Sequence, residues 1–222
     1  MDGNNRWAEK RSLSTKMGHQ AGSQAVITLV KSAIDFGVKY LTIYAFSNEN
    51  WQRPKQEVSD LMSLVKGYLE NKVGELIDNG VRIIAIGDLS RVNPIIKEKI
   101  RHVEQVTKSN KRIVLNIAFD YGSRQEIVNA FKKIAHDVKS DKIQLNQIDE
   151  SVINNNLYTC GTPDPDLLIR TSGEQRVSNF LLWQIAYTEF YFTEKLWPDF
   201  AKEDLYQAIL DFNQRKRRYG KR

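Results

Sequence analysis

The chain has 222 residues, of which 41% are hydrophobic and 27% charged, and its net charge is +6. This size and composition predict one globular domain. A single cysteine excludes an intrachain disulfide and favours a reducing, cytoplasmic setting. We find no apolar run long enough to span a membrane and no signal peptide. The positive charge permits nucleic acid, anionic lipid or phosphorylated metabolites as partners.

The first seven residues, Met-Asp-Gly-Asn-Asn-Arg-Trp, bring unlike functional groups into one short segment. The carboxylate of Asp2 can orient a divalent cation, while Arg6 offers a fork of N–H groups to phosphate oxygens. Gly3 lets the backbone approach a ligand closely. The alternative is a frayed polar terminus, which Trp7 disfavours. We therefore interpret the segment, including Asn4, as a site for an anion that arrives with a metal ion.

Strand-like and helix-like segments alternate along the rest of the chain. Strands are predicted at residues 40–46, 81–86, 113–119, 167–171 and 190–192. The first three are nearly continuously apolar and rich in β-branched residues, which is typical of strands buried on both faces. Helices are predicted over residues 18–36, 57–79, 94–109, 124–138 and 202–218. The pattern predicts an α/β fold, with one mostly parallel central sheet flanked by helices.

Arginines follow four of the predicted strands, each in a loop with small polar residues. Ligands of such sheets bind beyond the carboxyl ends of the strands. We therefore expect a site for several phosphate oxygens near Arg53, Arg91, Arg124 and Arg176. Residues 170–178 are the richest candidate, because they combine two arginines with hydroxyl groups and a glycine. The alternative for that segment is a surface cluster of ion pairs.

Common nucleotide and hydrolase motifs are absent, and no Cys/His cluster indicates zinc. His19 lies at the start of the first long helix, where it can donate to a phosphate or serve as a capping or exposed residue. Glu189 interrupts an aromatic stretch, and a metal ligand and a structural ion pair both remain open for it. The basic tail, residues 214–222, is either a solvated end or an anion-binding arm.

Five blocks, residues 1–8, 18–22, 42–53, 169–183 and 187–200, together resemble the cis-prenyltransferase family, most closely its bacterial undecaprenyl diphosphate synthases. The resemblance implies extension of an allylic diphosphate, typically farnesyl diphosphate, by isopentenyl diphosphate units with new Z double bonds. The product would be a long polyprenyl diphosphate, the carrier lipid for cell-wall sugars. The alternative within the family is a non-catalytic partner subunit, and those subunits typically lack the aspartate and the arginine pair that this chain has. A nucleic-acid binder is disfavoured because no recognised module is present.

The resemblance also implies roles for individual residues. Asp2 would position Mg²⁺ on the allylic diphosphate and is, with Asn50, a catalytic candidate. Ser47 and Asn50 would handle the proton lost in condensation, on a mobile loop that closes over the substrates. Glu189 would reach a second Mg²⁺, perhaps from the other subunit. Substrate binding is implied for Gly3, Asn4, Arg6, Trp7, His19, Ser47, Glu49, Trp51, Arg53, Arg170, Arg176 and Ser178. A tunnel between the sheet and the first two long helices would hold the growing chain, with Ala45, Val81 and Ile113 as candidates for its lining.

Family members form homodimers, and the ending Arg218-Tyr219-Gly220 resembles the motif that reaches the isopentenyl site across the interface. We expect a cytoplasmic enzyme with peripheral membrane contact through its lipid product, and no nucleic-acid partner.

Three positions depart from the family pattern. Asn5 stands where glycine is usual, so its backbone must avoid positive φ or accept strain. Thr15 stands where an arginine is common, and Lys16 is the candidate substitute. The family also has a strand ahead of the position of Met1. We expect either that another segment fills its place or that the chain is less stable than an N-terminally extended one.

Overall fold

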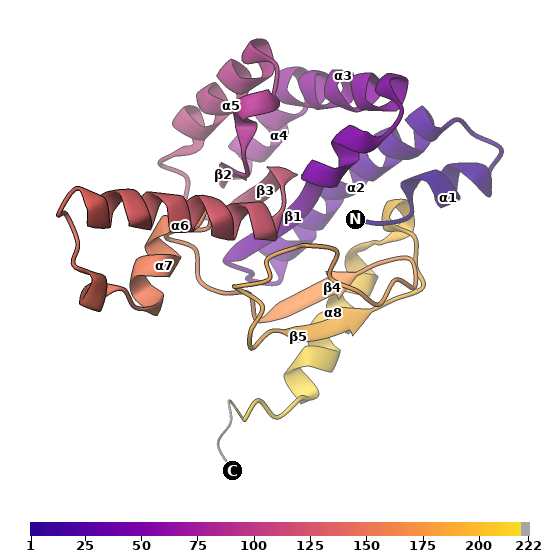
Figure 1. Cartoon of the computed structure of the whole chain (residues 1–222). Coiled ribbons are helices and arrows are strands. Elements are labelled where there is room, and N and C mark those ends of the chain that lie inside the picture. The colour runs from indigo at the N-terminus through magenta and orange to yellow at the C-terminus, as the bar shows by residue number, and fades with distance from the viewer. Residues whose placement is uncertain (219–222) are drawn as a thin grey trace.

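The structure, a computed structural model, describes residues 1–218, and its five strands form two parallel sheets (Figure 1). The first sheet has the order β1-β3-β2, with β1 at Tyr40–Ser47, β2 at Val81–Ile86 and β3 at Ile113–Tyr121. The second pairs β4 (Leu167–Arg170) with β5 (Glu189–Phe192). The parallel α/β class is as predicted.

The parallel strands are divided between these two sheets, and β1 and β4 each lie at the edge of one of them. Figure 1 shows the N-terminus between these two edges. The Trp197 N–H donates to the Asp2 carbonyl, which also accepts from the side chains of Thr171 and Ser172 just beyond β4. The N-terminal segment therefore anchors itself to the end of the second sheet.

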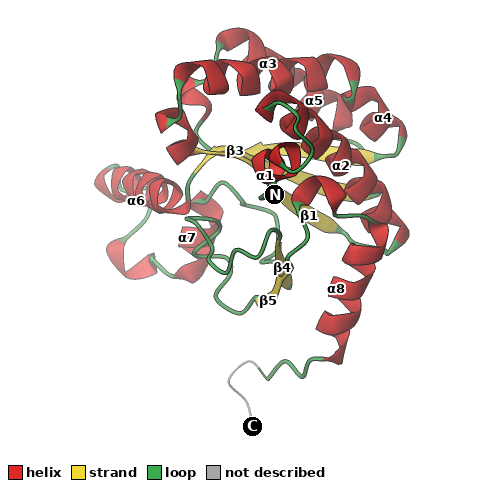
Figure 2. Cartoon of the chain, turned by 90° about the vertical axis from the view of Figure 1, so that its right-hand side faces the viewer, coloured by secondary structure: helices red, strands yellow, loops and turns green. Residues whose placement is uncertain are grey.

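Buried apolar residues explain the position of β3 in the middle of its sheet. Ile113, Leu115 and Ala118 are almost fully buried, as expected for a strand covered on both faces. One face packs against α2, α3 and α5, while the other packs against residues 180–185 and Tyr158. Figure 2 shows α3, α4 and α5 together on one side of the strands.

The helices follow the predicted order with additions and one break. They are α1 (Asn4–Glu9), α2 (Thr15–Asp35), α3 (Lys55–Asn71), α4 (Val73–Asp78), α5 (Pro94–Thr107), α6 (Ser123–Lys139), α7 (Glu150–Asn156) and α8 (Lys202–Gln214). The predicted helix over residues 57–79 is broken at Lys72, which allows α4 to bury Val73 and Leu76. The short helices α1 and α7 were not predicted, and α8 ends four residues before its expected limit of 218.

Residues 219 and 220 of the expected Arg-Tyr-Gly motif lie outside the described residues. Among residues 1–218, no helix has the length and apolar character needed to cross a bilayer.

Candidate active site

Asp2 is held at the carboxyl end of β4 by hydrogen bonds on both sides of its backbone. Its N–H donates to Thr171 Oγ1 at 3.0 Å, and its carbonyl accepts from Thr171 Oγ1 at 2.9 Å and Ser172 Oγ at 2.6 Å. The side chain is partly exposed, and its Oδ2 accepts from Arg170 Nε at 2.8 Å. The two candidate segments of the sequence, residues 1–7 and 170–178, thus form one site.

Gly3 makes this approach possible. Its φ of 107° lies in the left-handed region, and a Cβ there would stand 2.2 Å from Ser172 Oγ. Two glycines of α2 accommodate the next residue, because a Cβ on Gly18 would lie 2.3 Å from the Asn4 carbonyl and one on Gly22 would lie 2.4 Å from Asn4 Oδ1. Asn5 adopts helical backbone within α1 and avoids positive φ, as the sequence required.

Arginines surround Asp2, but several are already paired. Arg170 is mostly buried and also donates to Ser178 Oγ at 3.0 Å. Arg6 donates to the Ser172 carbonyl at 3.0 Å and pairs with Glu174 at 2.9 Å, and Arg176 pairs with the same carboxylate. An incoming diphosphate would compete with Glu174 for both partly exposed guanidinium groups.

His19 lies inside the first turns of α2, at one end of an apolar cavity. Within residues 1–218 its Nε2 is buried without a hydrogen-bond partner, and it stands 3.9 Å from Glu57. Burial and the nearby Arg53 lower the pKa of His19 against the opposing effect of Glu57, so the ring is neutral at pH 7. An unpartnered buried nitrogen at a cavity mouth is suited to a ligand. Lys16, one turn earlier, is exposed.

The residues after β1 form η1 (Asn48–Gln52), a short 3₁₀ helix. The Ser47 N–H donates to Asn50 Oδ1 at 3.1 Å, and Glu49 accepts from Asn179 at 2.8 Å. Arg53 pairs with Glu57 at the start of α3. This arrangement joins η1 to the loop after β4, close to Ser178. The expected mobility of η1 stays a prediction.

The two tryptophans of the predicted site are placed differently. Trp7 donates its indole N–H to Asp199 at 2.7 Å, and the Arg11 guanidinium lies 4.3 Å from its ring centre. Asp199 belongs to η4 (Trp197–Asp199), so Trp7 anchors α1, and its contact with substrate stays a prediction. Trp51 packs edge-on against Phe46 with ring centres 5.2 Å apart.

The expected row of four phosphate-binding arginines needs correction at Arg91. This residue forms two hydrogen bonds with Asp120, at 2.5 and 3.2 Å, and the Asp120 side chain is fully buried. Arg91 is therefore occupied by a partner that the sequence analysis missed. The available signal was the lone carboxylate at the end of the apolar strand β3.

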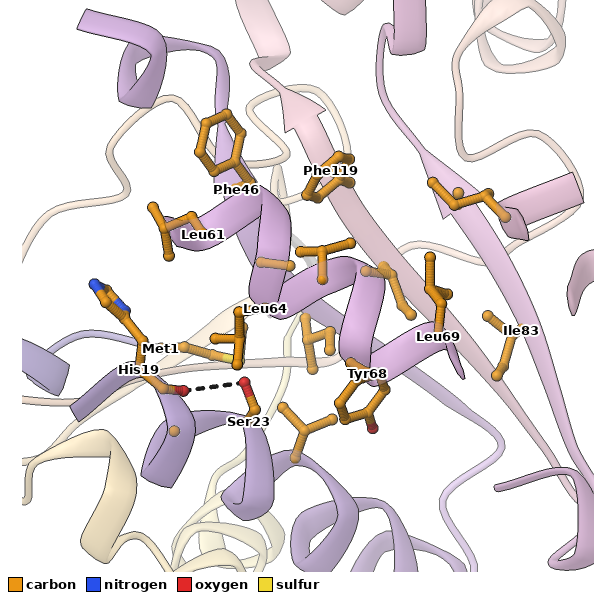
Figure 3. A pocket seen from close by; sticks show the side chains of 18 of the residues that line it. Met1, His19, Ser23, Phe46, Leu61, Leu64, Tyr68, Leu69, Ile83 and Phe119 are labelled. Carbon is orange, nitrogen blue, oxygen red and sulfur yellow. Dashed lines mark hydrogen bonds between the residues drawn. The ribbon is translucent and has the colours of Figure 1, made fainter. Parts of the chain in front are cut away.

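An apolar cavity opens beside the polar groups (Figure 3). Met1, Asn4 and His19 line it at the polar end, so it starts at the residues that flank Asp2. Most of the remaining lining comes from α2, α3, α5 and the strands, and it includes Val26, Ala45, Leu61, Leu64, Tyr68, Ile83, Val103 and Ile117. Of the expected lining residues, Ala45 is present, whereas Val81 and Ile113 lie in the buried core beyond the cavity.

Glu189 stands apart from Asp2. It pairs with Arg215 at 3.0 Å and lies opposite Leu167 at the start of β4, whereas Asp2 contacts Arg170 at its end. Of the two alternatives for Glu189, the structure therefore has the ion pair, which Glu189 forms with Arg215 of the same chain. A metal role through a second subunit stays a prediction.

The residues around Asp2 suit a magnesium ion that is carried by a substrate. Among residues 1–218, no group of three or more His, Cys, Asp or Glu side chains could hold a metal alone. Asp2 bonds Arg170 through Oδ2, and Oδ1 has no hydrogen bond within the same residues. Mg²⁺ is commonly held by one or two carboxylates together with substrate phosphates. The donor set therefore fits Mg²⁺ bound with a diphosphate.

Comparisons with known proteins agree with this arrangement. Residues 1–220 match the family described as putative undecaprenyl diphosphate synthase. An isoprenyl transferase from Clostridium perfringens is 53% identical over 220 residues, covering 99% of this chain and 87% of that protein. An isoprenyl transferase from Oceanobacillus iheyensis is 49% identical, with the same coverage of both chains.

Solved structures extend the likeness to the fold. The lavandulyl diphosphate synthase of Lavandula x intermedia, solved with dimethylallyl diphosphate, has a TM-score of 0.96 and 39% identity and covers 100% of this chain and 95% of its own. A probable undecaprenyl diphosphate synthase from Campylobacter jejuni has a TM-score of 0.81 and 36% identity, covering 91% of this chain and 93% of its own. These matches to transferases along the whole chain do not support a non-catalytic partner subunit. The chain belongs to the undecaprenyl diphosphate synthase family of prenyltransferases.

Proposed function

We propose that this chain is a Mg²⁺-dependent cis-prenyltransferase that condenses isopentenyl diphosphate onto an allylic diphosphate. One observation carries the proposal: the cationic site around Asp2 opens directly into an apolar cavity, because Met1 and Asn4 flank Asp2 and also line the cavity. A diphosphate ester with a prenyl tail has this same division into a charged end and an apolar end.

Asp2, Arg6 and His19 would hold the allylic diphosphate at the cavity mouth. Isopentenyl diphosphate would be held by Arg170, Arg176 and Ser178. Arg170 would link the two diphosphate sites, because it is hydrogen-bonded to Asp2 in the allylic site and to Ser178 in the isopentenyl site. Holding the two diphosphates in this way would place their reacting carbons side by side, which supplies much of the rate enhancement in such reactions. Mg²⁺, when bound, would neutralise the charge of the leaving diphosphate.

The residues of η1 would complete the site. Condensation joins the allylic carbon to the double bond of isopentenyl diphosphate, releases a diphosphate and loses one proton. Asn50 and Ser47 are our candidates for guiding that proton, because their mutual hydrogen bond fixes the amide near the loop after β4. Trp51 and Arg53 would cover the bound substrates.

Farnesyl diphosphate is the proposed primer and a long polyprenyl diphosphate, such as the undecaprenyl carrier of cell-wall sugars, the proposed product. We also propose a homodimer, supported by Val128 and Phe131, which are one turn apart and exposed on α6. A cytoplasmic enzyme of net charge +6 that releases an apolar product would work at an anionic membrane surface.

The direct test supplies farnesyl diphosphate, radiolabelled isopentenyl diphosphate and Mg²⁺ to the purified protein. Label should move into butanol-extractable product, and chromatography against polyprenol standards would give its length. Absence of extractable label from folded protein refutes the proposal. Omission of Mg²⁺ with chelator present should abolish incorporation.

A further inference from the structure

Arg91 is one of the arginines of the strand-end loops to which the proposed phosphate binding gives no role. It belongs to η2 (Leu89–Arg91) after β2, and its guanidinium donates hydrogen bonds to both carboxylate oxygens of Asp120 at the end of β3. The Asp120 side chain is fully buried, whereas that of Arg91 is about half exposed. A buried carboxylate requires such a partner, so Arg91 is held in one position rather than free to follow a ligand.

The backbone under this pair is itself constrained. Asp120 has a φ of 48°, an uncommon value for a residue with a side chain. Beside it, a Cβ on Gly87 would lie 2.0 Å from the Phe119 carbonyl, and the Asp88 N–H donates to the Asp120 carbonyl at 3.1 Å. The ends of β2 and β3 are therefore locked together, and the direction of the Asp120 carboxylate is set by that junction.

The exposed part of Arg91 reaches η1. Its guanidinium carbon lies 5.4 Å from the centre of the Trp51 ring, within the range of a cation–π contact. Phe46 packs against the same indole, whose Nε1 is buried and without a hydrogen-bond partner within residues 1–218. Within residues 1–218 the Trp51 indole is therefore held by packing against the apolar cluster that contains Phe46 and by the Arg91 guanidinium, not by a hydrogen bond.

We propose that Arg91 is a positioning residue that holds η1 against the active site through Trp51, with Asp120 fixing the guanidinium. The opposite side of η1 is tied by the hydrogen bond from Asn179 to Glu49. Between these two attachments stands Asn50, bonded to the Ser47 N–H. The role in catalysis rests on the proposed function, whereas the attachment of η1 does not.

The main variant combines Arg91→Gln with Asp120→Asn, which removes the charge over Trp51 without leaving a buried unpaired carboxylate. Asn tolerates the left-handed backbone at position 120, so the variant should keep the melting temperature close to that of the wild type. Loss of one cation–π contact of about 1 kcal/mol corresponds to a fall in kcat/KM for isopentenyl diphosphate of about fivefold. The triple variant Arg91→Gln/Asp120→Asn/Trp51→Leu should have the same kcat/KM as Trp51→Leu alone, because the substitutions at Arg91 and at Trp51 remove the same contact.

The matched control is Lys202→Gln on α8, since Lys202 also pairs with a carboxylate, Asp35, and lies 5.5 Å from an aromatic ring, Phe36. It should leave kcat/KM unchanged. The proposal would be overturned if the Arg91/Asp120 variant had the kcat/KM of the wild type. It would also be overturned if the triple variant lost kcat/KM by the product of the two separate losses.

A second measurement is independent of activity. Amide hydrogen exchange of residues 47–53 should be faster in the Arg91/Asp120 variant by about the same fivefold factor, while exchange in β3 stays as in the wild type. Unchanged exchange in η1 would overturn the positioning role. A wild-type protein that makes no prenyl product would refute the proposed function and leave this measurement to decide the attachment of η1.

Discussion

The two ends of the cavity are built in different ways. At the polar end, residues about 170 positions apart are joined by short hydrogen bonds, and glycines let α1 press against α2. At the apolar end, both α2 and α3 line the cavity, but α2 has nine buried residues along its length, whereas α3 has none. The first region is preorganised for charge, and in the second the loose packing of α3 leaves room for an apolar chain.

The largest expected effect tests the polar end. Asp2→Asn keeps an oxygen that can accept from Arg170 Nε but removes the negative charge that a metal ion needs. Turnover should fall by about 10²–10³-fold, as for loss of one preorganised electrostatic group, with little change in melting temperature. The assay is label incorporation from isopentenyl diphosphate. Activity of the variant near that of the wild type would remove Asp2 from the catalytic role.

A pair of glycine substitutions compares the packing at the two ends. Gly22→Ala places a methyl group against Asn4 in the contact of α1 with α2 and should cost about 1–3 kcal/mol of unfolding free energy. Gly67→Ala on α3 meets nothing within 4 Å and should stabilise by about 0.5–1 kcal/mol through helix propensity. Urea denaturation measures both. Equal effects would contradict the contrast in packing.

Tyr68 lines the apolar end of the cavity, opposite the polar end. Figure 3 shows it on the side away from His19, with Leu64 between them. Its hydroxyl is buried without a partner within residues 1–218, and burial raises the pKa of Tyr68. Because the ring packs on the core that contains Val81 and Ile113, Tyr68→Ala should deepen the cavity and lengthen the product.

Chromatography of the polyprenols compares Tyr68→Ala with Leu61→Ala, which opens the cavity near its mouth and should not lengthen the product. Tyr68→Phe should retain the wild-type length, since it keeps the ring. Unchanged length in Tyr68→Ala would place the limit on chain growth elsewhere.

The smallest effect concerns the pH dependence of stability. The pKa of His19 is lowered by burial, so below about pH 6.5 the unfolded chain binds more protons than the folded one. The stability that neutral His19 contributes is complete above that pH and is lost as the pH falls toward the folded-state value. His19→Gln should therefore lose less stability than the wild type between pH 7 and pH 5, as measured by urea denaturation. Parallel curves for the two proteins would show that His19 is not responsible.

The sequence predicted the buried strands well, because their continuous apolar runs depend on local pattern. The predicted strand at residues 81–86 coincides with β2, and that at 40–46 differs from β1 by one residue. Contacts between distant residues were not predictable in this way. The helix α1 depends on the glycines of α2, and the Arg91–Asp120 pair joins η2 to the end of β3.

In the candidate site, too, contacts between residues distant in sequence could not be predicted. The family resemblance assigned Asp2 and Arg170 to the two substrates of one reaction, and the structure joins these residues by an ion pair of 2.8 Å. The ion pair of Arg176 with Glu174 belongs to the cluster that was the alternative for residues 170–178. The pairing of Glu174 with Arg6 could not be read from spacing, because it joins residues far apart in the chain. The roles of these residues toward substrates stay predictions.

A structure with Mg²⁺ and an unreactive thiolo analogue of farnesyl diphosphate tests the central claim most directly. The account predicts the diphosphate beside Asp2, Arg6 and His19, and the prenyl chain between α2 and α3, pointing toward Tyr68. A diphosphate bound away from Asp2, or a prenyl chain lying outside this cavity, would contradict it.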